Sequence, residues 1–180
     1  IFSRPRRFET ETLETNTYLV ESEVETSHWW FLGRRKLLSN VLSGLNLSRE
    51  ASILDAGTGT GSGLRLLREM GFSHVTGVDS GELAVRFCAE KGLGDIPQGN
   101  VCNLPFRARQ FQVVLALDLL EHLEDDQKAL QEINRVLQPC GTALFTVPAF
   151  SGLWGVQDRA GRHWRRYQLG ELRERVRRAG

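Results

Sequence analysis

The stretch that decides the fold covers residues 53–63 and reads Ile-Leu-Asp-Ala-Gly-Thr-Gly-Thr-Gly-Ser-Gly. Its apolar start predicts a strand, and Leu64, Leu67 and Met70 beyond it have helical spacing. Glycine lets the backbone adopt conformations that a Cβ excludes and lets it approach a ligand closely. The stretch therefore predicts a strand, a ligand-binding turn and a helix in succession.

Apolar runs and helical patterns alternate from residue 51 onward, which is typical of βαβ units around a mostly parallel sheet. We expect further strands at residues 74–78, 96–99, 111–117 and 142–147. We expect further helices at residues 28–45, ending near Gly44, at 83–87, at 125–137, closed by Pro139 and Gly141, and at 168–179. The sequence thus predicts an α/β fold with one core over residues 28–180, preceded by a solvated arm over residues 1–27.

Composition narrows the function classes. The chain has 180 residues, 41% of them hydrophobic, and 23 Lys and Arg against 22 Asp and Glu, so bulk charge gives no reason to expect a nucleic-acid partner. No apolar stretch approaches the roughly 18 residues of a membrane span. The three cysteines form no CxxC pair, as in reduced thiols. We expect a cytoplasmic protein without a membrane span, a nucleic-acid partner or a metal site.

Two common nucleotide-binding patterns fail at the glycine turn. G-x-G-x-x-G fails in every register, because Ser62, Leu64 and Leu66 occupy the places of its last glycine, and no Gly-Lys-Ser/Thr follows. The pattern that remains, Asp-x-Gly-x-Gly-x-Gly, resembles the first motif of class I S-adenosylmethionine-dependent methyltransferases. This resemblance implies a Rossmann-like, doubly wound sheet with helices on both faces. It also implies cofactor contacts from Asp55, Gly57, Thr58, Gly59 and Gly61.

Three later segments resemble the same family in the same order. Asp79, with Ser80, ends the second predicted strand, where the family has the acid that binds the ribose hydroxyls. Residues 98–106 resemble a Gly-Asp-x-x-x-Leu-Pro-Phe segment that meets the adenine, with Val101 beside it and with Asn100 in place of the Asp. An Asn carbonyl still accepts from an amine, but without the charge. Residues 116–123 resemble the strand-four segment that ends in Glu-His-Leu, which adds Leu117 and Asp118 to the cofactor-binding residues.

The flanks resemble a bacterial subgroup with an N-terminal His-Trp-Trp-Phe-x-Gly-Arg-Arg helix, found here at residues 28–35, and a His-Arg-Tyr loop. Arg34 or Arg35 could pair with the methionine carboxylate, with Arg34 the preferred residue, and His122, His163 and Tyr167 are the candidate general bases. Structural alternatives remain open: the aromatic residues pack the helix on the sheet, and His122 fixes its loop. The Arg-rich residues 159–180 either meet an anionic acceptor or, as we expect, form a solvated face.

The resemblance implies transfer of a methyl group from S-adenosyl-L-methionine to an unidentified small-molecule or lipid-linked acceptor. Two alternatives stay open: a catalytically silent cofactor-binding or scaffold protein, and a nicotinamide-dependent oxidoreductase. The family sheet has seven strands, so we expect a C-terminally incomplete domain that lacks strands six and seven and leaves residues 142–147 as an exposed edge. The sequence does not indicate an oligomeric state.

Overall fold

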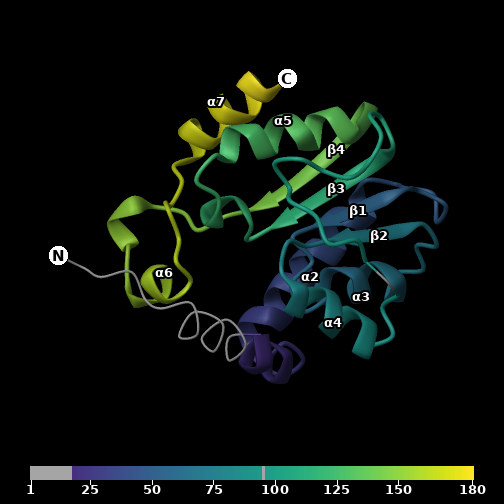
Figure 1. The fold of residues 1–180 in the computed structure, drawn as a ribbon, viewed down its shortest axis with the longest axis horizontal. Coiled ribbons are helices and arrows are strands. Elements are labelled where there is room, and N and C mark those ends of the chain that lie inside the picture. The colour runs from purple at the N-terminus through teal and green to yellow at the C-terminus, as the bar shows by residue number, and fades with distance from the viewer. Residues whose placement is uncertain (1–17, 95) are drawn as a thin grey trace.

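The computed structural model describes residues 18–94 and 96–180, in which four parallel strands form one sheet (Figure 1). The strand order is β2-β1-β3-β4. The strands are β1 Ile53–Ala56, β2 Val75–Val78, β3 Phe111–Leu117 and β4 Leu137–Thr146. Because the chain runs outward from β1 to β2 and then returns to the other side of β1 for β3, the order reverses between β1 and β3. In open α/β sheets, ligands bind at the carboxyl ends of the strands beside such a reversal.

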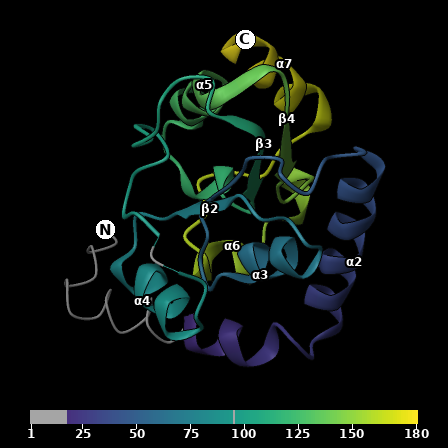
Figure 2. The same cartoon turned by 90° about the vertical axis from the view of Figure 1, so that its right-hand side faces the viewer.

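Helices cover both faces of this sheet (Figures 1 and 2). Their bounds are α2 Trp29–Gly44, α3 Ser62–Glu69, α4 Glu82–Glu90, α5 Asp126–Val136, α6 Val156–Ala160 and α7 Leu169–Ala179, with short 3-10 helices η1 Leu120–His122 and η2 Ser151–Leu153. Ile53 packs against α2 and α3, whereas its neighbour Leu54 packs against α5. Successive strand residues point to opposite faces, so both faces of β1 are buried. Helix α7 lies on α5.

Several predicted elements are confirmed. The helix over residues 28–45 is α2, which ends at Gly44, and the apolar run over residues 111–117 is β3 with the predicted bounds. The last helix is α7. Strand β4 pairs with β3 alone among the described strands and is therefore an edge strand, as expected. None of the helices in the described ranges is long and apolar enough to cross a membrane.

Two elements differ from the prediction. Residues 96–99 form no strand; Gln98 makes only an isolated bridge with Asp79, since Pro97 beside it has no N–H to donate to a ladder. Helix α5 ends at Val136, and the chain passes directly into β4 at Leu137, so Pro139 and Gly141 lie in a strand and do not close the helix. Pro139 disfavours a helical conformation at Gln138 directly before it, and a helix usually ends at or before such a residue. The loop after Pro148 also contains η2 and α6, which were not predicted.

The predicted N-terminal arm lies partly outside the described residues, since residues 1–17 are not among them. Residues 18–24 are helical. Glu25 is only 6% exposed, so the prediction of a solvated arm is wrong at this residue. The reason is a set of long-range partners at the glycine turn, described below.

Candidate functional site

The glycine turn between β1 and α3 needs its glycines for backbone conformation. Gly57, Gly59 and Gly61 have φ angles of 74°, 54° and 86°, which lie in the left-handed region. The backbone N–H groups of Gly57 and Thr58 both donate to the carbonyl of Val78, at 2.9 and 3.2 Å, so the turn is tied to the end of β2. A Cβ at Gly59 would meet no atom within 4 Å. At Gly59 the turn thus presents bare backbone to open space at the carboxyl end of the sheet.

Thr58 supports the turn through its side chain. Its hydroxyl donates to the carbonyl of Asp55 at 2.9 Å and accepts from the backbone N–H of Val78 at 3.1 Å. The residue is buried. The side chain therefore fixes the turn from inside. The backbone N–H of Thr58 donates to Val78 and its carbonyl accepts from the N–H of Gly61 at 3.0 Å, so the predicted cofactor contact of Thr58 stays a prediction.

Asp79 lies at the end of β2, where the sequence placed it. Its Oδ2 accepts from the N–H of Gly59 at 2.9 Å, and its Oδ1 accepts from the N–H of Gly81 at 2.8 Å. Each carboxylate oxygen has further lone pairs, so these bonds orient the group and leave acceptor capacity on both oxygens. Ser80 beside it is exposed, and its carbonyl accepts from Gln98 Nε2 at 2.8 Å.

Asp55 lies under the start of α3. Burial raises the pKa of its carboxyl to about 7, against the opposing effect of Arg34 and a hydrogen bond from the Leu64 backbone. A Cβ at Gly63 would lie 2.5 Å from Asp55 Oδ2, so a glycine is required there for close packing. Asp55 therefore joins β1 to the first turn of α3, which supports the turn from below.

The segment predicted to meet the adenine is ordered by its own contacts. Asn100 Oδ1 accepts from the backbone N–H of Cys102 at 2.8 Å, and the Asn100 residue is exposed. Val101 is buried in the core. Gly99 N donates to the Asp79 carbonyl at 2.8 Å, which holds this segment beside Asp79. Of these residues, Asn100 is the one whose side chain is accessible to a ligand.

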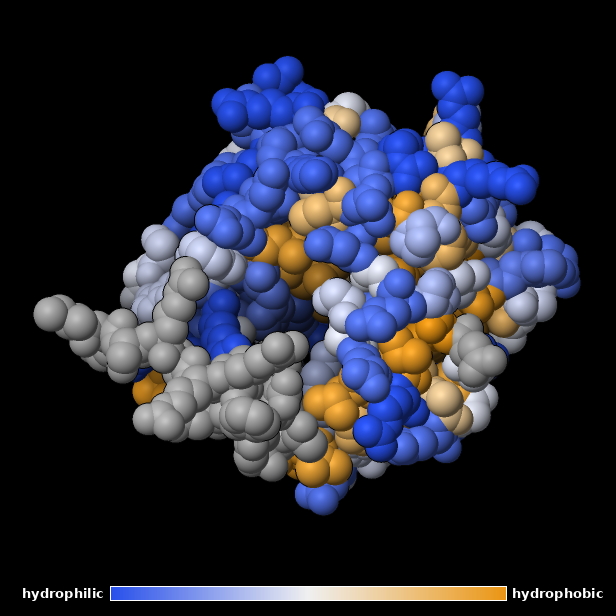
Figure 3. Space-filling model, viewed as in Figure 1, coloured by the Kyte–Doolittle hydropathy of each residue, from blue (hydrophilic) through white to orange (hydrophobic). Residues whose placement is uncertain are grey.

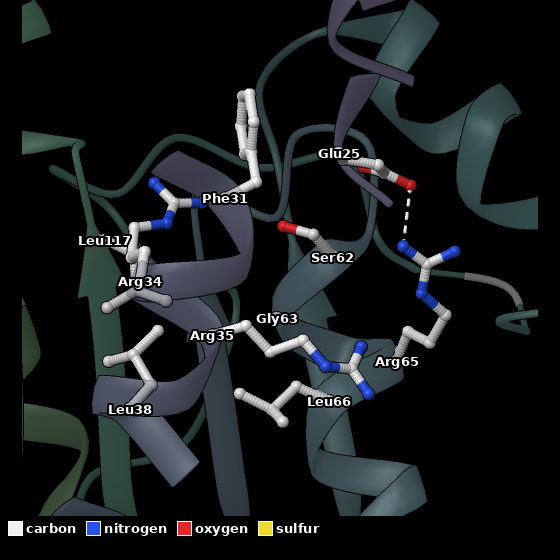
Figure 4. Close-up of a pocket in the computed structure, with 10 residues that line it drawn as sticks. All are labelled: Glu25, Phe31, Arg34, Arg35, Leu38, Ser62, Gly63, Arg65, Leu66 and Leu117. Carbon is white, nitrogen blue, oxygen red and sulfur yellow. Dashed lines mark hydrogen bonds and ion pairs between the residues drawn. The ribbon is translucent and has the colours of Figure 1, made fainter. Parts of the chain in front are cut away.

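Arg34 and Asp118, two residues predicted to contact the cofactor, pair with each other. Arg34 Nη1 donates to Asp118 Oδ2, and Asp118 Oδ1 accepts from the Thr146 hydroxyl at 2.9 Å. Asp118 follows β3 directly and has a φ of 51°. Leu117 before it lines a pocket between α2 and α3 together with Arg34 and Phe31 (Figure 4). The pair ties α2 to the carboxyl end of the sheet, and a guanidinium with five donors can still bind a second carboxylate.

Glu25, which the sequence analysis missed, connects the segment before α2 to the glycine turn. Its Oε2 accepts from the Thr60 hydroxyl at 2.6 Å, and its Oε1 accepts from Arg65 Nη2 at 2.8 Å, as drawn in Figure 4, and from Lys91 Nζ at 2.9 Å. Lys91 Nζ also donates to the Thr60 carbonyl at 2.9 Å. No local sequence signal distinguishes Glu25 from the other acidic residues of the stretch that was predicted to be solvated.

A second cluster lies beyond β3, in and near η1. The ring centroids of His122 and His163 are 4.7 Å apart, with the rings nearly perpendicular. Burial and the neighbouring His163 lower the pKa of His122. Buried Glu121 lies beside both rings, and burial raises the pKa of its carboxyl to about 8. The structure therefore brings together two of the three predicted bases and adds a carboxyl group that was not predicted.

Tyr167, the third predicted base, belongs to the core. It is 2% exposed, and its hydroxyl donates toward Asp126 Oδ2 at 2.8 Å and the Leu120 carbonyl at 3.1 Å. Burial and Asp126 raise the pKa of Tyr167 above its usual range. The prediction that Tyr167 is a general base is wrong, because its hydroxyl is shielded from any acceptor and is a very weak acid.

The arginines near Tyr167 clamp the loop to the rest of the domain. Arg165 pairs with Asp126 at 3.1 Å, and Arg166 Nε donates to Asp158 Oδ1 at 2.7 Å. Arg175 in α7 also pairs with Asp126, at 2.7 Å. The prediction of a solvated face is therefore wrong for these arginines, because they form ion pairs within the domain.

Comparison with known proteins agrees with this geometry. The "Methyltransferase domain" family matches residues 54–145. A glycine/sarcosine/dimethylglycine N-methyltransferase of Actinopolyspora halophila is 32% identical over 114 residues, which are 59% of this chain and 20% of that protein. A demethylmenaquinone methyltransferase of Thermotoga maritima is 36% identical over 92 residues, which are 49% of this chain and 40% of that protein. The chain thus spans less than half the length of these relatives.

Solved structures share the fold. The [4+2]-cyclase SpnF has a TM-score of 0.69 and 24% identity, covering 84% of this chain and 58% of its own. A chain from the complex of the Haloferax volcanii Trm112 methyltransferase activator with a methyltransferase has a TM-score of 0.74 and 23% identity, covering 92% and 73%. The family match covers the glycine turn, Asp79 and β3 together, and so the chain belongs to the class I S-adenosylmethionine-dependent methyltransferase family, whose cofactor is S-adenosyl-L-methionine.

Proposed function

We propose that this chain binds S-adenosylmethionine at the glycine turn and transfers its methyl group to a small-molecule or lipid-linked acceptor. The observation that carries the proposal is Asp79, a carboxylate oriented by two backbone N–H groups at the end of β2, facing the same turn that exposes Gly59. A carboxylate in this position can accept hydrogen bonds from two ribose hydroxyls.

The residues at the turn fit this cofactor. The open space at Gly59 admits a ligand against the backbone, and Asp79 retains acceptor capacity for the ribose. Asn100 offers a side-chain carbonyl for the adenine amino group, and Arg34 offers guanidinium donors for the methionine carboxylate. When bound, S-adenosylmethionine supplies a methyl group that its sulfonium already activates.

The protein's own task is then to position the acceptor and exclude water. The pair of Arg34 and Asp118 closes α2 against the end of β3, and Glu25 ties the preceding segment to Thr60. These two connections place a cover beside the turn. The lowered pKa of His122 keeps its imidazole neutral at neutral pH, with a lone pair that can receive a proton.

The proposed acceptor site is a hydrophilic hollow with apolar residues along its upper rim in Figure 3. Figure 3 shows the hollow on the face of Figure 1, at the carboxyl ends of β3 and β4 and between α6 and α2. Trp29 at the start of α2 is 73% exposed, and Trp164 in the loop after α6 is 56% exposed. Exposed aromatic side chains in these two elements suit an acceptor with an apolar part, which supports the lipid-linked class.

Isothermal titration calorimetry tests the first half of the proposal. We expect one equivalent of S-adenosylhomocysteine to bind and NADH to give no heat of binding. Binding of NADH would instead support an oxidoreductase. Absence of binding by both S-adenosylmethionine and S-adenosylhomocysteine would contradict the proposal.

A catalytically silent cofactor-binding protein is the second candidate. SpnF, named as a [4+2]-cyclase, shows that the fold alone does not determine the reaction. Mass spectrometry of a panel of small-molecule and lipid-linked acceptors, incubated with the chain and S-adenosylmethionine, separates the two. A mass gain of one methyl group supports transfer, and cofactor binding without any methylated product supports the silent protein.

A further inference from the structure

Three side chains of types that can bind a metal lie close together outside the glycine turn. Glu121 and His122 lie in η1, and His163 comes from the loop between α6 and α7. One ligand atom from each of the three lies within 4.8 Å of the other two. The sequence predicted no metal site, because these residues show no metal-binding spacing along the chain.

Glu121 is the unusual member of this cluster. Its side chain is 1% exposed, and one carboxyl oxygen accepts from its own backbone N–H. The other, Oε2, has no hydrogen-bond partner among the described residues. An unpartnered polar atom in this position carries an uncompensated cost of desolvation. A cation or a proton at Oε2 would remove that cost.

Both imidazoles are oriented from behind. His163 Nδ1 lies 3.1 Å from Asp158 Oδ1, which leaves Nε2 for a further partner. The ring of His122 donates to the carbonyl of Gly161. Histidines that bind metals nearly always donate their other N–H to a carboxylate or a carbonyl, which sets the tautomer and the ring orientation. Each histidine here has one acceptor of this kind.

Gly161 also leaves space for the imidazole ring of His163. A Cβ at this position would lie 2.8 Å from His163 Nε2 and 3.0 Å from its Cδ2. The φ of Gly161 is −75°, which any residue adopts, so the requirement for glycine here is spatial. Gly161→Ala would therefore displace the His163 ring without removing a ligand.

We propose that Glu121, His122 and His163 bind one divalent transition-metal cation of the Zn²⁺, Co²⁺ or Fe²⁺ type. Two imidazoles and a carboxylate are the donor set that such borderline cations prefer. Bonds of about 2.1 Å place tetrahedral ligand atoms about 3.4 Å apart, so binding of an ion requires the three side chains to close inward from the 4.8 Å within which their ligand atoms lie. The remaining coordination positions are open to water or to an acceptor oxygen. The site is inferred without reference to methyl transfer, and an ion on His122 would occupy the lone pair that could otherwise receive a proton.

Cobalt titration of the whole chain, stripped with a chelator and with cysteines kept reduced, tests this site. We expect one equivalent of Co²⁺ to produce visible d–d absorption of a four- or five-coordinate ion, and Zn²⁺ to displace it. A thiolate-to-cobalt charge-transfer band would place the ion on a cysteine and overturn the proposal. Absence of saturable binding would overturn it too, and would leave Glu121 as a neutral, protonated acid.

Variants locate the ion. His122→Ala, His163→Ala and Glu121→Gln should each weaken Co²⁺ binding at least 10-fold, and Gly161→Ala should weaken it with all three ligands present. His74→Ala is the matched control, because His74 is exposed and pairs with Glu50 on the surface. Equal affinity in the ligand variants and in the control would overturn the site. S-adenosylhomocysteine binding, measured on the same samples, verifies that each variant is folded and reports separately on the proposed function.

Discussion

Two carboxylates at the carboxyl edge of the sheet, those of Asp79 and Glu121, differ in their hydrogen-bond partners. Asp79, beside the glycine turn, has a backbone N–H on each oxygen. Glu121, beyond β3, has one oxygen with no partner among the described residues. A carboxylate with a backbone donor on each oxygen is oriented for a neutral ligand such as a ribose. A buried carboxylate with a free oxygen instead requires a proton or a cation. The edge therefore carries two sites of different chemistry.

The largest expected effect is on the pH dependence of stability at Glu121. Its folded-state pKa of about 8 lies above the ordinary value of 4.5, so the folded protein holds this proton more tightly than the unfolded chain. That contribution is fully present below pH 4.5 and is lost as the pH rises through 8. In a chelating buffer, the free energy of unfolding should fall between pH 4.5 and pH 9 by about 4 kcal/mol more in the wild type than in Glu121→Gln.

Urea unfolding at several pH values measures this difference. Asp55, with its own raised pKa of about 7, titrates in both proteins and cancels. Glu124→Gln, at an exposed position three residues away, is the matched control and should follow the wild type. Parallel curves for the wild type and Glu121→Gln would show that Oε2 is solvated, and the contrast between the two carboxylates would disappear.

The second prediction concerns the other carboxylate. Asp79→Ala should raise the Kd for S-adenosylhomocysteine about 100-fold, since it removes the ribose acceptor and releases the N–H of Gly59. Asp79→Asn, which keeps one acceptor oxygen, should lie between. Arg178→Ala, at an exposed position of α7 that pairs with Glu174, is the control. Calorimetry that finds the same Kd for Asp79→Ala and Arg178→Ala would refute the assignment of Asp79.

Glu25 gives a smaller effect in the region of the glycine turn. Glu25→Gln should lower the free energy of unfolding by about 2 kcal/mol, because Arg65 and Lys91 lose a shared ionic partner but stay partly exposed to water. Hydrogen exchange of residues 18–27 should become faster. Glu23→Gln, at an exposed position in the preceding helical residues, should change neither quantity. Unchanged exchange in Glu25→Gln would mean that other contacts hold this segment.

Tyr167 gives the smallest effect. Tyr167→Phe should cost about 1 kcal/mol of stability through the lost bonds to Leu120 and Asp126, while the pH profile of methyl transfer stays unchanged. Urea unfolding and initial rates measure the two quantities. A large loss of kcat at unchanged stability would return Tyr167 to the role of general base.

Local sequence patterns correctly predicted β3 and the end of α2. Residues 111–117 are apolar without interruption and form β3 with the predicted bounds, and α2 ends at Gly44 as its spacing indicated. The strand predicted at residues 96–99 was wrong, because an apolar pattern carries no information on backbone N–H groups. Pro97 has no N–H to donate to a neighbouring strand. The end of α5 was also missed, because Leu137 continues the apolar face of the helix while its backbone is already extended.

At the site, the sequence correctly predicted the positions of residues that come immediately after a strand. Asp79 and Asp118 lie at strand ends, and the carboxyl ends of parallel strands meet at one edge. It did not find Glu25, whose partners Thr60, Arg65 and Lys91 are 35, 40 and 66 residues away. Tyr167 was assigned to catalysis because a motif shows residue types and order, but not whether a hydroxyl points into the core.

The sequence by itself determined the alternation of strands and helices, the glycine turn and the family, because these depend on periodicity and on conformations that only glycine allows. Only the tertiary structure decided which charged groups pair and which stay unpaired. Arg34 is bound to Asp118, Asp158 orients His163, and Glu121 is left with an unpartnered oxygen beside two imidazoles. The physical reason is that burial and charge pairing depend on distances between residues that the chain brings together only when it folds.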